Sequence, residues 1–490
     1  MNTYIGIDLG TSAVKLLLAD RDGNILSSVS REYPVFYPQN GWSEQNPEDW
    51  LEAVKSGLIE LLSDIDRHSV RGISFGGQMH GLVVLDSDDN VIRPAILWND
   101  GRTEEETKYL NEIIGKEKLS KYTANIAFAG FTAPKLLWLK NNEPENFKKI
   151  AKIMLPKDYI AYKMTGAHST DYSDASGTLL LDVKNKCWSE EMLEICSVKR
   201  EWLPKLYESF QVIGKPIDEF GLSNAIVTAG AGDNAAAAIG CGVTGDGDCN
   251  ISLGTSGTVF ISGDKFTQDK NNALHSFAHA NGKYHLMGCI LSAASCNRWW
   301  MEKILNSTDY DAEQIGLYEL LGKNDVIFLP YLMGERSPHN DVNARGAFIG
   351  ISPETSRQQM TLAVMEGVAF ALKDCVEVAN QGGISIKLSR ICGGGARSKI
   401  WKKIIANVLG FPIETLKTEE GPAFGAAILA MVGAGEFPTV DDAVKTIVNT
   451  NEIILPDSVL TQKYDIRYSI FKRLYPSLKE NFAIMNEEKT

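Results

Sequence analysis

The sequence predicts an α/β protein made of two related halves with a cleft between them. The segment Asn250 to Ser256, which reads Asn-Ile-Ser-Leu-Gly-Thr-Ser, repeats the Ile-x-Leu-Gly-Thr-Ser pattern of residues 7–12 almost half a chain later. Such an internal repeat indicates a duplicated unit. The chain has 490 residues, enough for two large domains at about 150 residues or more each. We therefore expect one domain over residues 1–243 and a second over residues 244–490.

Each copy places a Gly-Thr-Ser turn between two apolar strands. The glycine lets the backbone fold back, so that successive N–H groups and two hydroxyls point at one anion. A single copy is more typical of an ordinary hairpin with a polar turn. The second copy favours two phosphate sites that face each other and clamp a polyphosphate. Only the first copy carries a carboxylate, Asp8, where the second has Ser252, so we expect a metal ion beside the first turn.

Composition excludes several classes of protein. The hydrophobic content of 44% and charged content of 23% are ordinary for a globular protein with a large core. A net charge of -13 argues against binding to nucleic acid or an anionic membrane. The first residues carry Asp8 where a signal peptide needs a basic and then an apolar region, and no apolar run is long enough to cross a bilayer. We therefore expect a cytoplasmic protein.

Cysteine and histidine spacing predicts no metal cluster. The eight cysteines are scattered without a Cys-x-x-Cys pair, which indicates reduced thiols. His275, His279 and His285 lie close in sequence, but no fourth ligand follows at a usual spacing.

The first half begins with a meander of strands, because Arg21-Asp-Gly-Asn24 turns the second strand into a third. A helix then starts at Asn46-Pro47, where asparagine caps it and proline takes the first turn. The next strand ends in Gly77-Gln78-Met79-His80-Gly81. Strand ends bordered by glycine often meet ligands, although a buried core histidine is the alternative for His80.

The middle of the chain carries a Gly-x-Gly-x-x-Ala turn from Gly230 to Ala235, between a strand and a small-residue helix. This pattern is typical of dinucleotide-binding folds. The helix is short, however, and Asp233 would repel a pyrophosphate there. A carboxylate at a helix N-terminus suits a general base instead. A simple N-cap role for Asp233 remains the alternative.

The second half offers fewer polar motifs. After the repeated turn, Trp299 is either a core residue or a platform for a nucleotide base, and Gly334-Glu335-Arg336 begins a polar loop. A long amphipathic helix is expected from about Gln359. Gly393-Gly394-Gly395 then joins a strand to a helix, which allows close approach of something flat or anionic, or is simply a tight turn. A closely packed helix rich in small residues is expected from Gly421.

No Gly-x-x-x-x-Gly-Lys-Ser/Thr motif and no protein-kinase motif set occurs, so any nucleotide must be held by the paired turns. Two long segments, Gly130 to Asn142 and Gly346 to Glu366, resemble the two signatures of the FGGY carbohydrate kinases. This family lies within the actin-like ATPase superfamily. The resemblance covers nearly the whole chain and implies two ribonuclease-H-like domains with a central cleft.

Within the family, the closest similarity is to members that phosphorylate D-xylulose, and the Gln-Met-His element is its most discriminating part. The resemblance implies that the sugar contacts Gln78, Met79, His80, Asp233 and Asn234. It further implies that Asp233 is the general base and that Asp8 is the second catalytic residue, supporting Mg²⁺ and the phosphates. The nucleotide contacts it implies are Thr11, Ser12, Gly254 and Thr255 at the phosphates and Trp299, Gly394, Gly395 and Ser398 at the adenosine. Ser398 stands where some relatives carry asparagine, which leaves its contact with the base open.

The implied reaction is transfer of the γ-phosphoryl of ATP, with Mg²⁺, to the terminal hydroxyl of D-xylulose. The alternatives are ribulose, fuculose, gluconate or glycerol as the acceptor, because these kinases share the architecture. An actin-like ATPase without a sugar substrate, and a dehydrogenase using the Gly230 turn, are the rivals from other classes. The oligomeric state stays open, a homodimer included.

Overall fold

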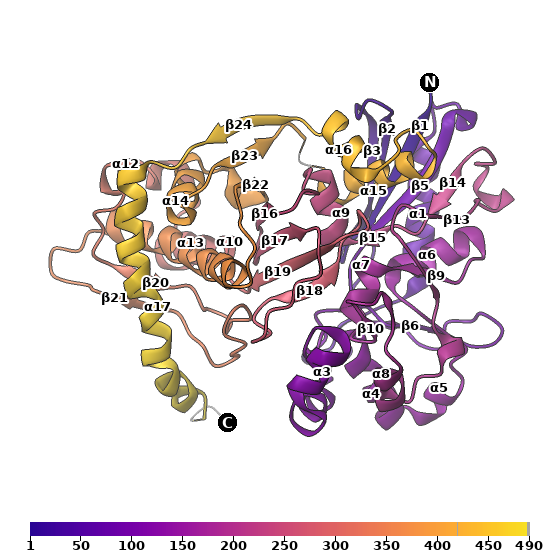
Figure 1. Ribbon diagram of the computed structural model, residues 1–490, viewed down its shortest axis with the longest axis horizontal. Helices are drawn as coiled ribbons and strands as arrows, with labels where there is room; N and C mark the ends of the chain where they lie inside the picture. The colour runs from indigo at the N-terminus through magenta and orange to yellow at the C-terminus, as the bar shows by residue number, and fades with distance from the viewer. Residues whose placement is uncertain (419, 488–490) are drawn as a thin grey trace.

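The computed structural model describes residues 1–418 and 420–487 and has two lobes side by side (Figure 1). Within these residues each lobe contains a mixed sheet of seven strands. The first lobe is formed mainly by the N-terminal half and the second by the C-terminal half (Figure 1). None of the described helices combines the length and the apolar character that a bilayer span requires.

The first sheet has the order β13-β14-β5-β1-β2-β3, with β15 beside β5. The strands β1, β2 and β3 form an antiparallel meander, whereas β5 and β14 run parallel to β1. The bounds are β1 Thr3–Leu9, β2 Ala13–Asp20, β3 Ile25–Glu32, β5 Val70–Gly77, β13 Val212–Gly214, β14 Ile226–Thr228 and β15 Ala231–Gly232.

The second sheet repeats this plan in the order β18-β19-β17-β16-β22-β23-β24. The strands β16, β17 and β19 are antiparallel, and β22 runs parallel to β16. The bounds are β16 Asp248–Leu253, β17 Gly257–Gly263, β18 His275–Ala278, β19 Tyr284–Ile290, β22 Leu388–Cys392, β23 Ile413–Leu416 and β24 Thr450–Ile454. The shared plan, an antiparallel meander followed by parallel strands, supports the predicted duplication.

The helix α1 (Pro47–Leu61) begins where the sequence predicts. The side chain of Asn46 accepts a hydrogen bond from the N–H of Glu48, and the apolar stripe of Trp50, Val54 and Leu58 is buried against the sheet. Residues 83–207 add a region beside the first sheet. Its elements are β6 Val83–Leu85, β7 Ala95–Ile96, α2 Glu104–Lys108, α3 Lys116–Thr123, α4 Thr132–Asn142, α5 Pro144–Lys148, β8 Lys152–Met154, α6 Pro156–Thr165, β9 Ser169–Asp171, α7 Tyr172–Ala175, β10 Leu181–Asp182, β11 Cys187–Trp188, α8 Glu190–Cys196 and β12 Lys205–Tyr207, while β4 Glu44–Gln45 pairs with β7.

The long helix α13 (Arg357–Gln381) begins two residues earlier than predicted, because Ser356 and Gln359 form a capping box. The remaining elements of the second half are α10 Ala294–Arg298, α11 Tyr310–Glu313, α12 Leu317–Leu320, β20 Ile327–Leu329, β21 Ala347–Ile349, α14 Lys399–Leu409, α15 Gly421–Gly433, α16 Val440–Ile447 and α17 Ser458–Glu487.

The two halves interlock through α9 (Asp233–Gly240) and α15. A Cβ on Gly425 of α15 would lie 1.8 Å from the carbonyl oxygen of Ala236 in α9, so the two helix backbones touch. A Cβ on Gly6 of β1 would lie 1.8 Å from the carbonyl oxygen of Ala423. The predicted small-residue helix from Gly421 is thus confirmed, and it packs on the sheet of the first half although it comes from the second (Figure 1).

Candidate functional site

The first Gly-Thr-Ser turn is held rigidly by side chains from elsewhere in the first half. The indole N–H of Trp98 donates to the hydroxyl of Thr11 at 2.9 Å, and the amide of Gln45 donates to the Thr11 carbonyl at 2.7 Å. The amide of Gln78 donates in turn to Gln45 Oε1 at 3.0 Å. Ser12 at the tip of the turn is exposed. The turn is therefore preorganised and open to a ligand.

The carboxylates of Asp8 and Asp233 lie at the same edge of the first sheet, separated by β5. Asp8 is opposite Gly76 on one side of β5, and Gly232 is opposite Gly77 on the other side. Asp233 follows directly and begins α9. Since neighbouring strands are about 4.8 Å apart, the two acidic residues start from backbones roughly 10 Å apart.

Burial changes the protonation of both carboxylates. It raises the pKa of Asp8 to about 7, with a smaller contribution from the negative charge of Asp233. It also raises the pKa of Asp233 to about 6, against two hydrogen bonds to Oδ1 from the backbone and side-chain amides of Asn234 at 2.7 and 3.0 Å. The N-cap of α9 is Gly232, so the alternative that Asp233 is the cap is wrong. A carboxylate with a pKa near 6 suits a general base at neutral pH.

Met79 packs against the residue that precedes Asp233, and His80 follows Met79 in the chain. A Cβ on Gly232 would lie 3.0 Å from Met79 Cγ, so the residue before Asp233 packs directly on Met79. His80 is in the left-handed region with φ 70, and its Nδ1 lies 2.7 Å from the carbonyl oxygen of Gly177. Because a carbonyl only accepts, Nδ1 carries the proton and Nε2 is left as an acceptor. Burial lowers the pKa of His80 to about 3, so the ring is neutral.

Gln78 and Asn234 face different neighbours. Gln78 is buried and directs its amide nitrogen to Gln45, so in this structure it supports the first turn. Asn234 is half-buried next to Asp233. The structure thus brings Met79, His80, Asp233 and Asn234 together around the end of β5.

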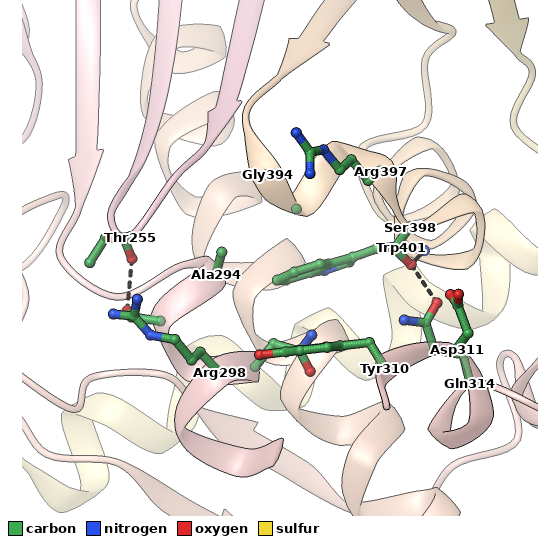
Figure 2. A pocket seen from close by; sticks show the side chains of 13 residues that line it. Thr255, Ala294, Arg298, Tyr310, Asp311, Gln314, Gly394, Arg397, Ser398 and Trp401 are labelled. Atoms are coloured by element: carbon green, nitrogen blue, oxygen red, sulfur yellow. Dashed lines mark hydrogen bonds between the residues drawn. The ribbon is translucent and has the colours of Figure 1, made fainter. Parts of the chain in front are cut away.

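The second turn opens on a pocket of about 400 Å³ in the second half (Figure 2). Four of the predicted nucleotide contacts line it, namely Thr255, Gly394, Gly395 and Ser398. A hydrogen bond holds the turn in place, because the N–H of Ala294 donates to the Gly254 carbonyl at 2.9 Å. In Figure 2 the flat side chains of Tyr310 and Trp401 face each other across the pocket.

Trp299 does not belong to the lining of this pocket. Its ring stacks on Phe328 with centroids 6.1 Å apart and packs against the core of the second half. No sequence motif marks Tyr310, Arg298 or Gln314, which do line the pocket. Tyr310 comes from the four-residue helix α11, in a stretch without a motif.

A second cavity, of about 620 Å³, lies between the two halves. Trp98 and residues 126–130 line it from the first half, and Leu291 and residues 335–336 and 340–342 line it from the second. Because Trp98 also donates to Thr11, one wall of this cavity is hydrogen-bonded to the first Gly-Thr-Ser turn.

Comparison with known proteins decides the family. The profile for the N-terminal domain of the FGGY family of carbohydrate kinases matches residues 3–240, and the profile for its C-terminal domain matches residues 249–434. The chain belongs to the FGGY family of carbohydrate kinases. It is therefore a sugar kinase, a phosphotransferase that uses ATP as a substrate.

Members of the FGGY family with similar sequences include the xylulose kinase of Escherichia coli K12, which is 38% identical and covers 97% of this chain and 99% of its own. The xylulose kinase of Bacillus subtilis 168 is 36% identical over the full length of both chains. A crystal structure of a xyloylose kinase from Brucella ovis has a TM-score of 0.93 at 39% identity and covers 98% of this chain and 100% of its own. A gluconate kinase from Lactobacillus acidophilus reaches 0.94 at 27% identity, covering 99% of each chain.

These FGGY structures confirm the predicted fold class of two α/β domains of the actin-like, ribonuclease-H-like type. The gluconate kinase matches as well as the xyloylose kinase does. The fold alone therefore does not distinguish one sugar from another, and the substrate must be argued from side chains.

Proposed function

We propose that this kinase transfers the γ-phosphoryl of ATP to the terminal hydroxyl of D-xylulose. The observation that carries the proposal is the grouping of Met79, His80 and Asp233 at the end of β5, beside the first phosphate turn. The relatives named xylulose kinase, at 36–38% identity over nearly their whole length, favour this pentulose over other acceptors.

In this proposal Asp233 accepts the proton of the attacking hydroxyl. Its pKa of about 6 leaves it ionised at neutral pH and basic enough to assist. The neutral His80 accepts a hydrogen bond from a sugar hydroxyl at Nε2, since Nδ1 is already committed to Gly177. Phosphoryl transfer needs little covalent chemistry from the protein, so positioning and charge stabilisation carry most of the rate.

Asp8 is the proposed protein contact of Mg²⁺. Its carboxylate is half-buried at the same edge of the sheet as Asp233, and burial raises its pKa, with a smaller contribution from the negative charge of Asp233. Lys15 lies opposite Asp8 on β2, but its ammonium forms an ion pair with Glu420. A divalent cation there would neutralise the excess charge, and Mg²⁺ typically uses one or two carboxylates together with substrate phosphates. When bound, the ion would neutralise charge on the transferring phosphates.

The pocket behind the second turn is the proposed adenosine site. Thr255 and Gly254 would approach the phosphates, while Gly394 and Gly395 leave room for the flat base beside Ser398, whose hydroxyl donates to Gln314 at 2.7 Å. Tyr310 replaces Trp299 as the candidate stacking platform, because its ring faces the pocket (Figure 2).

Tyr310→Ala is expected to raise the KM for ATP about 10-fold or more, because stacking of an aromatic side chain on a base contributes about 1–3 kcal/mol. Tyr310→Phe keeps the ring and should behave as the unaltered enzyme. Steady-state kinetics with ATP varied at saturating D-xylulose measures the effect. An unchanged KM for ATP in Tyr310→Ala would place the base elsewhere.

The acid limb of the pH profile should report the two carboxylates. Both Asp8 and Asp233 must be ionised, so kcat/KM for D-xylulose, measured with Mg²⁺ and ATP well below saturation, should fall as the pH drops through about 7 and then about 6. Below both values the slope should approach two. Bound Mg²⁺ and ATP favour the ionised form of Asp8. The pH profile of kcat should therefore show only the decrease near pH 6 that reports Asp233. A kcat/KM that stays flat from pH 8 to pH 5 would contradict this assignment.

A coupled ADP-release assay over D-xylulose, ribulose, fuculose, gluconate and glycerol, with Mg²⁺ and ATP, tests the proposed substrate. The proposal expects the highest kcat/KM with D-xylulose. An acceptor preferred over D-xylulose would overturn the choice of sugar. ADP release that is unaffected by every acceptor would favour an actin-like ATPase without a sugar substrate.

We further propose that residues 1–243 supply the sugar site and the base and that residues 244–490 supply the nucleotide site. The scattered cysteines favour a reducing compartment, and we assign the enzyme to the cytoplasm.

A further inference from the structure

The polar loop from Gly334 to Asn340 has no role in the proposed reaction, but several hydrogen bonds hold it in place. The N–H of Ser337 donates to the Cys289 carbonyl at 2.9 Å, and the N–H of Cys289 donates to the Ser337 hydroxyl at 3.0 Å. The buried carboxyl group of Glu335 accepts from the N–H groups of Leu291 and Arg336, both at 2.8 Å. These hydrogen bonds hold the loop against β19 and thereby fix the backbone from which the side chain of Arg336 extends.

The guanidinium of Arg336 points across to the first half. Its central carbon lies 5.1 Å from the ring centre of Phe128, and both residues line the cavity between the halves. Among the described residues the guanidinium has no hydrogen-bond or ion-pair partner, and the side chain is only half-buried. Five N–H donors are thus held at the cavity wall without an acceptor.

Packed aromatic rings connect this wall of the cavity to His80 of the proposed sugar site. Phe128 packs on Phe131 at 5.4 Å, and Phe131 stacks on His80 at 4.6 Å between ring centres. Lys135 ties the same two parts together, because its ammonium donates to the His80 carbonyl at 2.8 Å and to the Gly130 carbonyl at 2.7 Å. Arg336 is therefore connected to His80 through the rings of Phe128 and Phe131, whereas Met79, next to His80 in the chain, packs on Gly232, the residue before the base.

We infer that Arg336 determines sugar specificity by donating hydrogen bonds to the oxygen atoms at C1 and C2 of the bound ketose. This inference rests on the proposed function, in which Asp233 takes the opposite end of the sugar, at C5. A group beyond His80 then meets the ketone end. Because Arg336 comes from the nucleotide half, sugar binding contacts both halves at once.

The chemistry of a guanidinium fits a ketone better than an alcohol. A carbonyl oxygen has two lone pairs in one plane and no hydrogen, so it matches a planar fork of donors. A hydroxyl at the same place also carries a hydrogen, which a site made only of donors leaves without an acceptor. Such a site selects the ketose over the alditol formed by reducing its C2 carbonyl.

The test compares D-xylulose with its two C2-reduced alditols, xylitol and D-arabinitol, in Arg336→Gln and Arg336→Lys. The loss of a hydrogen bond from a charged donor should lower kcat/KM for D-xylulose about 10- to 100-fold, mainly through KM. The values for the alditols, or their inhibition constants where turnover is too slow, should change less than about threefold. The KM for ATP should not change.

Lys116→Gln is the matched control, because Lys116 is a second cation that lines the same cavity and its side chain is exposed. It should leave the preference for ketose over alditol unchanged. Equal losses for ketose and alditols in the Arg336 variants, or a loss confined to kcat, would overturn the inference and leave the proposed function standing. A wild-type enzyme that phosphorylates no pentulose would instead overturn the proposed function, and Arg336 with it.

Discussion

Asp233→Asn is expected to lower the turnover of D-xylulose by about 100- to 10,000-fold, which is the usual contribution of general-base assistance. The asparagine has nearly the same shape and can still accept from the two amides of Asn234 that now bond to Asp233 Oδ1. It cannot take a proton. Folding should be preserved, because Gly232 rather than Asp233 is the N-cap of α9.

Single-turnover phosphorylation and the melting temperature, measured side by side for Asp233→Asn and Asp233→Ala, separate the two roles. If Asp233 is the base, the chemical step should be slow in both variants, while ATP affinity and stability should stay nearly unchanged. A structural residue predicts a lower melting temperature in Asp233→Ala with little change in the chemical step. Near-normal turnover in Asp233→Asn would show that another group removes the proton.

Asp8→Asn is expected to have the second largest effect. Removing the carboxylate should raise the Mg²⁺ concentration needed for half-maximal rate about 10- to 100-fold and lower the turnover at saturating ATP. The affinity for D-xylulose should change little, since Met79 and His80 follow β5 and Asp233 begins α9, whereas Asp8 belongs to β1. Steady-state rates over a Mg²⁺ titration at fixed ATP give this constant directly.

Asp22→Asn provides the matched control for Asp8→Asn, because it removes an exposed carboxylate from the turn between β2 and β3. This variant should keep the Mg²⁺ dependence of the unaltered enzyme. An Asp8→Asn enzyme with an unchanged Mg²⁺ requirement would mean that the ion is held by the phosphates and other groups, and that Asp8 acts only through its charge.

The local parts of the fold could be predicted because their signals are local. The repeated Gly-Thr-Ser turn revealed two equivalent sheets, and Asn46 with Pro47 marked the start of α1. The helix α13 begins two residues before the predicted position near Gln359, because Ser356 and Gln359 form a capping box at its start.

The long-range parts could not be read from the sequence. Glycines in α15 indicated close packing, but nothing in the sequence named Gly6 of β1 and Ala236 of α9 as the backbones that come into contact. Tyr310 joins the nucleotide pocket only through the folding of a short helix without a motif. Arg336 was visible as part of a polar loop, yet its approach to Phe128 of the other half required the structure.

In the proposed reaction the enzyme phosphorylates a ketopentose at its terminal hydroxyl, with the base Asp233 at that end of the sugar. Phosphorus NMR of the product formed from ATP and D-xylulose tests this reaction, because coupling of the phosphorus to the C5 protons identifies the esterified oxygen. We expect one phosphomonoester at C5, formed in step with ADP. A phosphate ester at C1, or ADP and free phosphate without a sugar ester, would contradict it.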